Sequence, residues 1–380
     1  MKLTRLGIPG LFAGLILAAC GGGATPASSA PAPASVAPSK PAASALAAAP
    51  SSAASAKPAA STSASAKPAA SGQATAITLA LGYIPNVQFA PFYVAQAKGF
   101  YKDEGVDISF DNGISPDLIK AVGAGKFKFA IADPDTVISA REQSIPVTYV
   151  AGLYAQAPSA IISLPGANIR RPQDLKGKKI GLPGRYGSGY IGLLGVLNKA
   201  GLSEKDVDIQ EIGFNQAPQL LAGKVDAVVG FANNDALQVQ AQANTKPNVI
   251  PISDVIPFIG NGLVTNDDTL KSNDKLVQGM ARAMLKGMQY TAAHPDEAFL
   301  ITAKVVPEAG GQNAKLNQDV LAASIPLWKD KGTDANGLGY TDTASWKAME
   351  DVMAKAGIVK TPPPVDQLVT NKYISKDLKI

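Results

Sequence analysis

Aromatic and amide side chains follow several of the strands that we expect in this 380-residue chain. Tyr83 and Asn86 come just after an expected strand at 77–81, and Phe89 opens the helix that follows. Ligands of open α/β sheets gather at the carboxyl ends of the strands, so these side chains predict a ligand pocket. Rings stack on flat ligands and amides hydrogen-bond to polar edges, so the predicted chemistry is binding. The other candidates of this kind are Tyr154, Asn215, Phe231, Asn233 and Asn234.

A glycine-rich loop, GLPGRYGSGYIG, occupies residues 181–192 between an expected strand and an expected helix. Its spacing Gly187-x-Gly189-x-x-Gly192 matches the dinucleotide-binding fingerprint. That fingerprint needs a tight turn after the strand, whereas residues 182–186 intervene here, so we disfavour a dinucleotide site. We expect backbone N–H groups at the helix start to meet a polar or anionic edge of a ligand instead. The side chains expected to assist them are Arg185, Tyr186, Ser188 and Tyr190.

Two aspartates, Asp133 and Asp135, stand where an expected strand at 127–132 meets the next helix. Asp135 or Thr136 is a good helix cap, which accounts for one of these positions. The remaining carboxylate would accept hydrogen bonds from NH or OH groups of a ligand. Neighbouring carboxylates are also typical of metal and acid–base sites, but no histidine or further acidic cluster accompanies them.

Each candidate position also has a purely structural interpretation. Tyr83 and Phe89 can be core aromatics, the asparagines can cap helices, and the glycine-rich loop can be a plain strand-to-helix turn. These alternatives stay open at the level of the sequence.

The chain has one histidine, His294, and one cysteine, Cys20. His294 stands beside Pro295 at an expected helix break, so we expect a structural role for it. No Gly-x-Ser-x-Gly motif is present either, so a hydrolase triad or a metal site lacks its parts. We therefore expect no catalysis, no metal and no cofactor.

The charge of the chain is unevenly distributed. Five of the 35 lysines and arginines lie before residue 76 and all 30 acidic residues lie after it, so residues 76–380 carry equal numbers of both. The basic character belongs to the N-terminal part, and nothing in the rest indicates nucleic-acid binding.

Residues 76–380 are too many for one compact core, which predicts two lobes. Runs rich in β-branched residues alternate with helical patterns, and this alternation predicts an α/β fold with mainly parallel sheets. After about residue 273 the pattern is helical. The expected strands are 127–132, 147–151, 161–164, 178–182, 207–212 and 225–231, and the expected helices are 115–123, 135–143, 188–200, 215–222 and 234–243.

Residues 1–20 have the features of a lipoprotein signal peptide. Lys2 and Arg5 form a positive start, residues 6–17 form an apolar stretch too short to span a bilayer, and Leu-Ala-Ala-Cys20 forms a lipobox. Cys20 is therefore expected to carry a lipid. Residues 21–75 are rich in Ala, Ser and Pro and contain no acidic residue, so we expect a disordered tether.

The segment 82–110, GYIPNVQFAPFYVAQAKGFYKDEGVDISF, resembles the opening of substrate-binding lipoproteins from ABC importers for the thiamine pyrimidine precursor, riboflavin or aliphatic sulfonates. The Tyr-x-Pro-Asn loop at 83–86 and the run FYVAQAKGFYKDEGVDI carry the resemblance. It implies a two-lobe periplasmic-binding-protein type II fold, with the ligand cleft between the lobes and lobe 2 inserted into lobe 1. Segments 165–168 and 257–262 suit the two crossings, so we place lobe 1 at 76–165 and 263–380, and lobe 2 at 166–262.

The same resemblance implies a monomeric solute-binding protein, anchored by lipid to the extracytoplasmic face of the bacterial membrane, that delivers its ligand to an ABC permease and its ATPase. Dense aromatics, with Arg185 as the one basic residue of these loops, favour a flat heteroaromatic ligand. We rank riboflavin first, because the Pro-Gly-Arg-Tyr-Gly loop resembles the riboflavin binders, and the thiamine pyrimidine second.

Two alternatives remain, a binder of aliphatic sulfonates or other anions, and an extracytoplasmic enzyme or sensor on the same fold. The resemblance extends to pyrimidine-precursor synthases that use a cysteine-rich iron site. Cys20 is the only cysteine of this chain, so that activity is not expected.

The variant Cys20→Ser tests the lipobox. We expect it to abolish incorporation of labelled lipid and to release folded protein from membranes, because no thiol remains to be acylated. Labelling is measured by feeding cells a tagged fatty acid, and Ser29→Ala is the matched control in the tether. Lipid that still attaches to the Cys20→Ser protein would show that the lipobox assignment is wrong.

Overall fold

The computed structural model describes residues 74–113 and 115–380. The predicted signal peptide, Cys20 and nearly all of the predicted tether lie outside these residues. The described chain forms two five-stranded sheets with helices between most of the strands, which confirms the predicted α/β fold.

The first sheet has the strand order β2-β1-β3-β10-β4. β1 is parallel to β2 and β3, whereas β10 is antiparallel to both of its neighbours, β3 and β4. The strands are β1 (Thr75–Ala80), β2 (Val106–Asp111), β3 (Phe129–Ala132), β4 (Val147–Gly152) and β10 (Gly262–Asn266).

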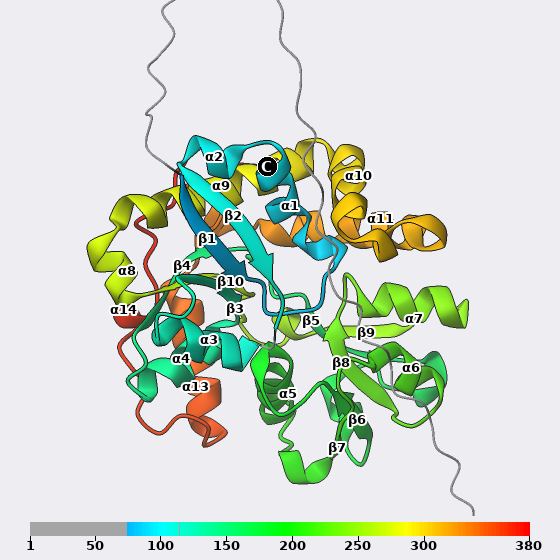
Figure 1. Ribbon diagram of the computed structural model, residues 1–380. Coiled ribbons are helices and arrows are strands. Elements are labelled where there is room, and N and C mark those ends of the chain that lie inside the picture. Colours follow the sequence, from blue (N-terminus) through cyan, green and yellow to red (C-terminus); the bar gives the residue numbers. More distant parts are fainter. Residues whose placement is uncertain (1–73, 114) are drawn as a thin grey trace, which may run out of the picture. The chain divides into compact units, whose positions relative to one another are not determined.

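The second sheet has the order β7-β6-β8-β5-β9. β6 is parallel to β7 and β8, and β5 is antiparallel to β8 and β9. Figure 1 shows β1 and β2 of the first sheet in blue and cyan, and β6, β7 and β8 of the second sheet in green. The strands are β5 (Ser159–Ser163), β6 (Lys179–Leu182), β7 (Asp208–Glu211), β8 (Ala227–Phe231) and β9 (Asn248–Pro251).

The prediction of mainly parallel sheets is wrong for β5 and β10, which make every antiparallel pairing between the named strands. Each is the first strand that the chain forms after it passes from one sheet to the other. Parallel pairing arises when a helix connects two strands of the same sheet, and neither β5 nor β10 is reached through such a connection. Because β5 belongs to the second sheet, we propose that the first crossing lies at 153–158, before the expected boundary at 165.

Helices connect most of the strands and form most of the chain after β10. They are α1 (Ala90–Ala97), α2 (Phe100–Asp103), α3 (Ser115–Gly123), α4 (Pro134–Glu142), α5 (Gly187–Lys199), α6 (Gln216–Leu221), α7 (Asp235–Ala243), α8 (Asp267–Ser272), α9 (Asp274–Ala293), α10 (Pro295–Val305), α11 (Ala314–Ser324), α12 (Lys331–Asn336), α13 (Thr343–Lys355) and α14 (Val365–Leu368). Short 3₁₀ turns include η1 (Val87–Phe89) and η5 (Ile252–Asp254).

The long helix α9 has the amphipathic pattern that its sequence predicts. Leu276, Met280 and Met284 recur at helical spacing and are buried. The helix ends at Ala293, and Pro295 begins α10, where its missing N–H has no partner to lose. Among the helices of residues 74–113 and 115–380, none has the length and apolar character that crossing a bilayer requires.

One hydrophobic cluster contains buried residues of both sheets. Val264 of β10 and Ile180 of β6 belong to it, together with Trp346 and Met349 of α13. The two sheets thus share apolar packing on the side of α4, α5 and α13, which limits how far they can separate without exposing this cluster.

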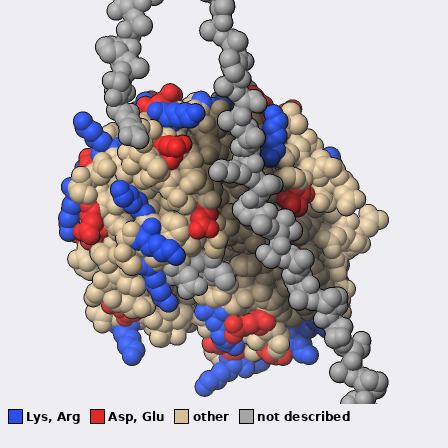
Figure 2. Space-filling view, viewed as in Figure 1, with Lys and Arg blue, Asp and Glu red and all other residues tan. Residues whose placement is uncertain are grey.

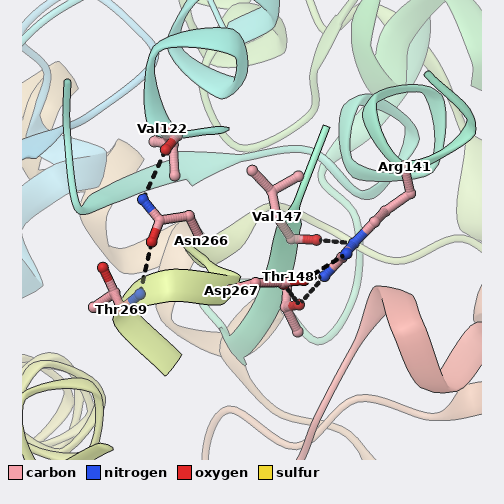
Figure 3. A network of polar contacts seen from close by, with 7 residues as sticks. All are labelled: Val122, Arg141, Val147, Thr148, Asn266, Asp267 and Thr269. Atoms are coloured by element: carbon pink, nitrogen blue, oxygen red, sulfur yellow. Dashed lines mark hydrogen bonds and ion pairs between the residues drawn. The ribbon is translucent and has the colours of Figure 1, made fainter. Parts of the chain in front are cut away.

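A polar network fixes β10 between β3 and β4 (Figure 3). Arg141 of α4 donates to both carboxylate oxygens of Asp267, at 3.0 and 2.5 Å, and its Nε donates to the Val147 carbonyl at 2.5 Å. Asn266 donates to the Val122 carbonyl at 2.8 Å and accepts from the Thr269 N–H at 2.8 Å. These hydrogen bonds therefore fix Asn266, the last residue of β10, and Asp267, the first residue of α8.

We predict that Arg141→Met lowers the free energy of unfolding by about 2–4 kcal/mol, because it leaves a mostly buried Asp267 without its bidentate partner. Urea denaturation of the wild type and the variant measures this difference. The control is Lys315→Met, which breaks an exposed pair with Asp319 and should cost about 0.5 kcal/mol or less. Equal losses in the two variants would contradict a special role for the Arg141 network.

Candidate functional site

A cleft lies at the carboxyl ends of β1 and β3 in the first sheet and of β6, β7 and β8 in the second. This is the edge where ligands of α/β proteins bind. The two segments that cross between the sheets also line it, through Leu153 and Tyr154 after β4 and Asn261 before β10. The aromatic lining residues are Tyr83, Phe89, Tyr154, Tyr186, Phe214 and Phe231, and the polar ones include Gln88, Asp133, Ser159, Ser188, Gln216, Asn234, Asp235 and Asn261.

Eight of the predicted site residues line this one cleft, although they come from distant parts of the chain. Contact of these side chains with a ligand stays a prediction. They are Tyr83, Phe89, Asp133, Tyr154, Tyr186, Ser188, Phe231 and Asn234.

Aromatic rings reach the cleft from both sheets. Tyr83, after β1, and Phe214, after β7, meet edge to face with ring centroids 4.9 Å apart. Phe214 is 38% exposed, so this pair lies at the solvent side of the cleft. The Tyr186 ring lies against Gly184, where an added Cβ would come within 2.3 Å of the ring. Gly184 therefore leaves the space that Tyr186 occupies.

Tyr154 forms a buried polar junction below these rings. Its hydroxyl accepts hydrogen bonds from Nε2 of Gln88 and Nδ2 of Asn233, each at 3.3 Å. Asn233 also donates to Oγ of Ser324 at 2.7 Å. Gln88 follows β1 and Asn233 follows β8, so the network joins the two sheets. Asn233 serves this junction and does not line the cleft, contrary to its predicted position.

Asn86 and Asn215 also lie outside the cleft lining. The Asn86 side chain accepts from the Gln88 N–H at 3.0 Å and so caps η1. The Asn215 amide donates to the Ile212 carbonyl at 3.2 Å. Both side chains hydrogen-bond to nearby backbone, which is the usual use of asparagine in turns.

Arg185, Tyr190 and Asp135 line a neighbouring hollow beside α5 instead of the cleft. Arg185 pairs with Glu204 and, at 3.4 Å, with Glu211. Tyr190 donates to the Glu204 carboxylate at 3.3 Å. Arg185 and Tyr190 thus interact with acidic residues of other elements and do not line the cleft.

Three carboxyl groups lie in the cleft wall or next to it, of which Asp135 and Asp235 are buried and Asp133 is half-buried. Asp133 accepts from the Ser188 N–H at 3.4 Å, and burial raises its pKa although hydrogen bonds from Ser188 lower it. Burial, and then the neighbouring Asp133, raise the pKa of Asp135 well above its ordinary range. Burial raises the pKa of Asp235 to about 6, against a 2.6 Å hydrogen bond from the Phe231 N–H.

The glycines of the 187–192 fingerprint have packing roles. Gly187 begins α5 with a φ of +71°, a conformation that favours glycine. A Cβ on Gly189 would lie 3.3 Å from Val229 of β8, and one on Gly192 would lie 2.6 Å from Ile252 of η5. The spacing therefore lets α5 approach β8 and η5 closely, which accounts for the pattern without a dinucleotide.

Sequence reasoning missed several lining residues that stand beside predicted ones. Phe214 and Gln216 flank Asn215, Asp235 follows Asn234, and Gln88 precedes Phe89. The signal, a position after a strand, was present for each. Which of two adjacent loop side chains faces the cleft depends on the backbone path of the loop, which the sequence pattern does not show.

Comparison with known proteins agrees with this fold. Residues 86–298, more than half of the chain, match the family described as NMT1/THI5 like. The chain belongs to the NMT1/THI5-like family. The match spans strands of both sheets, from η1 to α10.

The relatives of this NMT1/THI5-like protein include binding proteins and enzymes. It is 37% identical over 295 residues to the riboflavin-binding protein RibY of Chloroflexus aurantiacus, covering 77% of this chain and 84% of that protein. It is 27% identical over 267 residues to a formylaminopyrimidine-binding protein of Halalkalibacterium halodurans, covering 69% and 80%. It is 29% identical over 306 residues to a 4-amino-5-hydroxymethyl-2-methylpyrimidine phosphate synthase of Saccharomyces cerevisiae, covering 77% and 85%.

Solved structures confirm the predicted periplasmic-binding-protein fold. The alkanesulfonate-binding protein SsuA of Xanthomonas axonopodis superposes with a TM-score of 0.61 at 15% identity, covering 79% of this chain and 99% of that one. A Candida albicans protein with the generic periplasmic binding protein fold gives 0.58 at 14% identity, covering 80% and 97%. At these identities the likeness shows the fold alone. Over residues 74–113 and 115–380, no group of three His, Cys, Asp or Glu side chains is arranged to hold a metal.

We predict that the stability difference between Asp235→Asn and the wild type depends on pH. The folded pKa of Asp235, about 6, exceeds its unfolded value, so ionisation destabilises the folded wild type. This penalty is complete above pH 6 and is relieved as the pH falls toward 4. The stability of the variant relative to the wild type should therefore decrease by about 1 kcal/mol between pH 7 and pH 5.

Urea denaturation at the two pH values measures this change. Asp107→Asn, the same substitution at an exposed position of β2, is the matched control. A pH-independent difference for Asp235→Asn, or a pH dependence equal to that of the control, would contradict the buried, charged state of Asp235.

Proposed function

We propose that this protein is the solute-binding component of an ABC importer and that its ligand is a flat heteroaromatic vitamin or precursor, with riboflavin ranked first. The observation that carries the proposal is the group of aromatic rings from both sheets in one cleft. Tyr83 and Phe89 approach from the first sheet, and Tyr186, Phe214 and Phe231 from the second. A flat ring system between such faces gains about 0.5–1.5 kcal/mol per aromatic pair beyond burial of its area.

Amide side chains in the cleft suit the polar edge of a flavin. Gln88, Gln216, Asn234 and Asn261 all line it, and each amide offers a donor and an acceptor. The dimethylbenzene edge of a flavin needs apolar neighbours, which Leu81, Ile131 and Val229 supply from the wall. The lining thus offers both the polar and the apolar contacts that such a ligand needs.

The 37% identity to a riboflavin-binding protein supports riboflavin as the first candidate. The thiamine pyrimidine is the second candidate, and the formylaminopyrimidine-binding relative favours it. A pyrimidine has a single ring and would contact fewer of the aromatic residues. The proposed ligands share the requirement for stacking and for amide hydrogen bonds.

Binding without catalysis is part of the proposal. The synthases of this family resemble the chain over a similar length, but its one cysteine is Cys20 and its one histidine is His294. His294 packs on Tyr290 with ring centroids 4.5 Å apart and is not a lining residue. An iron site of the cysteine-rich type therefore lacks its ligands.

We further propose that a lipid on Cys20 anchors the protein outside the cytoplasm, and that it acts as a monomer. Closure of the two sheets on the ligand would exclude water and present the loaded form to a permease and its ATPase. The test is ATP hydrolysis by the reconstituted transporter, which should increase with riboflavin-loaded protein and stay at its basal rate with unloaded protein.

Titration with riboflavin tests the ligand. We expect the flavin fluorescence to be quenched on binding, because tyrosine rings stack on the flavin. Tyr186→Ala should weaken binding by roughly tenfold, which corresponds to the loss of about 1.4 kcal/mol. Tyr190→Ala is the matched control, since Tyr190 hydrogen-bonds to Glu204 and does not line the cleft.

Two results would count against this proposal. Absence of quenching at tens of micromolar riboflavin, with clear heat of binding from a pyrimidine or a sulfonate, would remove the flavin and leave the binding protein. Equal losses of affinity in Tyr186→Ala and Tyr190→Ala would contradict the stacking position of Tyr186.

A further inference from the structure

The charged side chains that line the cleft are all acidic. Among the described residues that form its wall, Asp133 and Asp235 are charged, and neither lysine, arginine nor histidine occurs with them. Each carboxylate accepts a hydrogen bond from a backbone N–H, Asp133 from Ser188 at 3.4 Å and Asp235 from Phe231 at 2.6 Å, and such bonds favour the charged form. A ligand in this cleft therefore meets two negative charges on opposite sheets.

The nearest basic residue of the loops, Arg185, does not compensate for these charges. It pairs with Glu204 and with Glu211, and it lies in the neighbouring hollow beside α5. Over the face shown in Figure 2, lysines and arginines are interspersed with acidic residues. That outer face therefore offers no continuous basic field to attract an anion toward the protein.

The N-terminus of α5, a common anion-binding element, already has acidic partners. The Ser188 N–H donates to Asp133 at 3.4 Å, and the Gly187 N–H lowers the pKa of Asp135. Both carboxylates come from the first sheet, whereas α5 follows β6 of the second. A phosphate or sulfonate at this end of the helix would have to displace Asp133.

We propose that Asp133 and Asp235 are specificity-determining residues that make the cleft select neutral ligands and reject anionic ones. On the proposed function, on which this inference rests, the protein takes riboflavin and discriminates against riboflavin 5′-phosphate (FMN). A phosphate inside a partly dehydrated cleft would lie near two carboxylates, and like charges placed together oppose binding strongly. We expect FMN to bind roughly 100-fold more weakly than riboflavin, which is two factors of ten in the dissociation constant.

Fluorescence titration of the full chain with riboflavin and with FMN at pH 7.5 tests this inference. The quantity of interest is the dissociation constant of FMN divided by that of riboflavin. This ratio cancels any general effect of a variant on flavin binding. Asp133→Asn should lower the ratio by roughly tenfold, because the amide keeps the shape and removes the charge. Asp235→Asn should act in the same direction. Asp107→Asn, an equal change of charge at an exposed position of β2, should leave the ratio as in the wild type.

Each outcome separates the inference from the proposed function. Riboflavin binding with weak FMN binding that Asp133→Asn strengthens supports the inference. Equal affinities for the two flavins, or a ratio that neither variant changes, would overturn it and leave the proposed function intact. If no flavin binds, the proposed function fails, and titration with MOPS, a sulfonate, decides the inference alone. Binding of MOPS to Asp133→Asn and not to the wild type supports it, and any other result overturns it.

Discussion

A short seam between the two segments that cross between the sheets is the constraint on which the cleft depends. The N–H groups of Leu153 and Tyr154 both donate to the Asn261 carbonyl, at 3.0 and 3.2 Å. Gly260 packs so closely on Tyr154 that an added Cβ would lie 2.4 Å from the tyrosine Cβ. The two sheets are covalently connected through these segments, so the seam helps to set how their carboxyl ends face each other. The Tyr154 hydroxyl adds hydrogen bonds from both sides, and the shared cluster around Trp346 packs against α4 and α5.

The wall of the cleft contains two carboxyl groups, those of Asp133 and Asp235, whose charge lowers the stability of the fold. Asp133 and Asp235 are held in the wall by backbone N–H groups, from Ser188 and Phe231, which offset part of the cost of burial. Their raised pKa values show that the offset is incomplete, so the folded domain loses some stability at neutral pH. Residues that destabilise a fold are commonly those that serve its binding site. Here the same burial that raises the pKa would strengthen repulsion of an anionic ligand.

The loop before α5 shows how one pattern can serve different purposes. In a dinucleotide-binding protein its glycines would admit a pyrophosphate to the helix N-terminus. In this chain Gly189 and Gly192 admit Val229 and Ile252, and a carboxylate from the other sheet faces the helix start. The physical requirement, close approach of backbone to a neighbour, is the same in both cases. The identity of the neighbour is what differs.

Local sequence patterns were enough to predict the α/β alternation, most strand and helix positions, the amphipathic face of α9 and the loops that form the cleft. These features follow from local periodicity and from the positions of glycine and proline, which need no information from distant residues. The folded arrangement set the antiparallel direction of β5 and β10, because direction depends on how the chain crosses between sheets. It also decided that Phe214 and not Asn215 faces the cleft, and that Arg185 pairs with Glu204 and Glu211 instead of a ligand. Those outcomes depend on contacts between residues far apart in the chain, and such contacts exist only once the chain has folded.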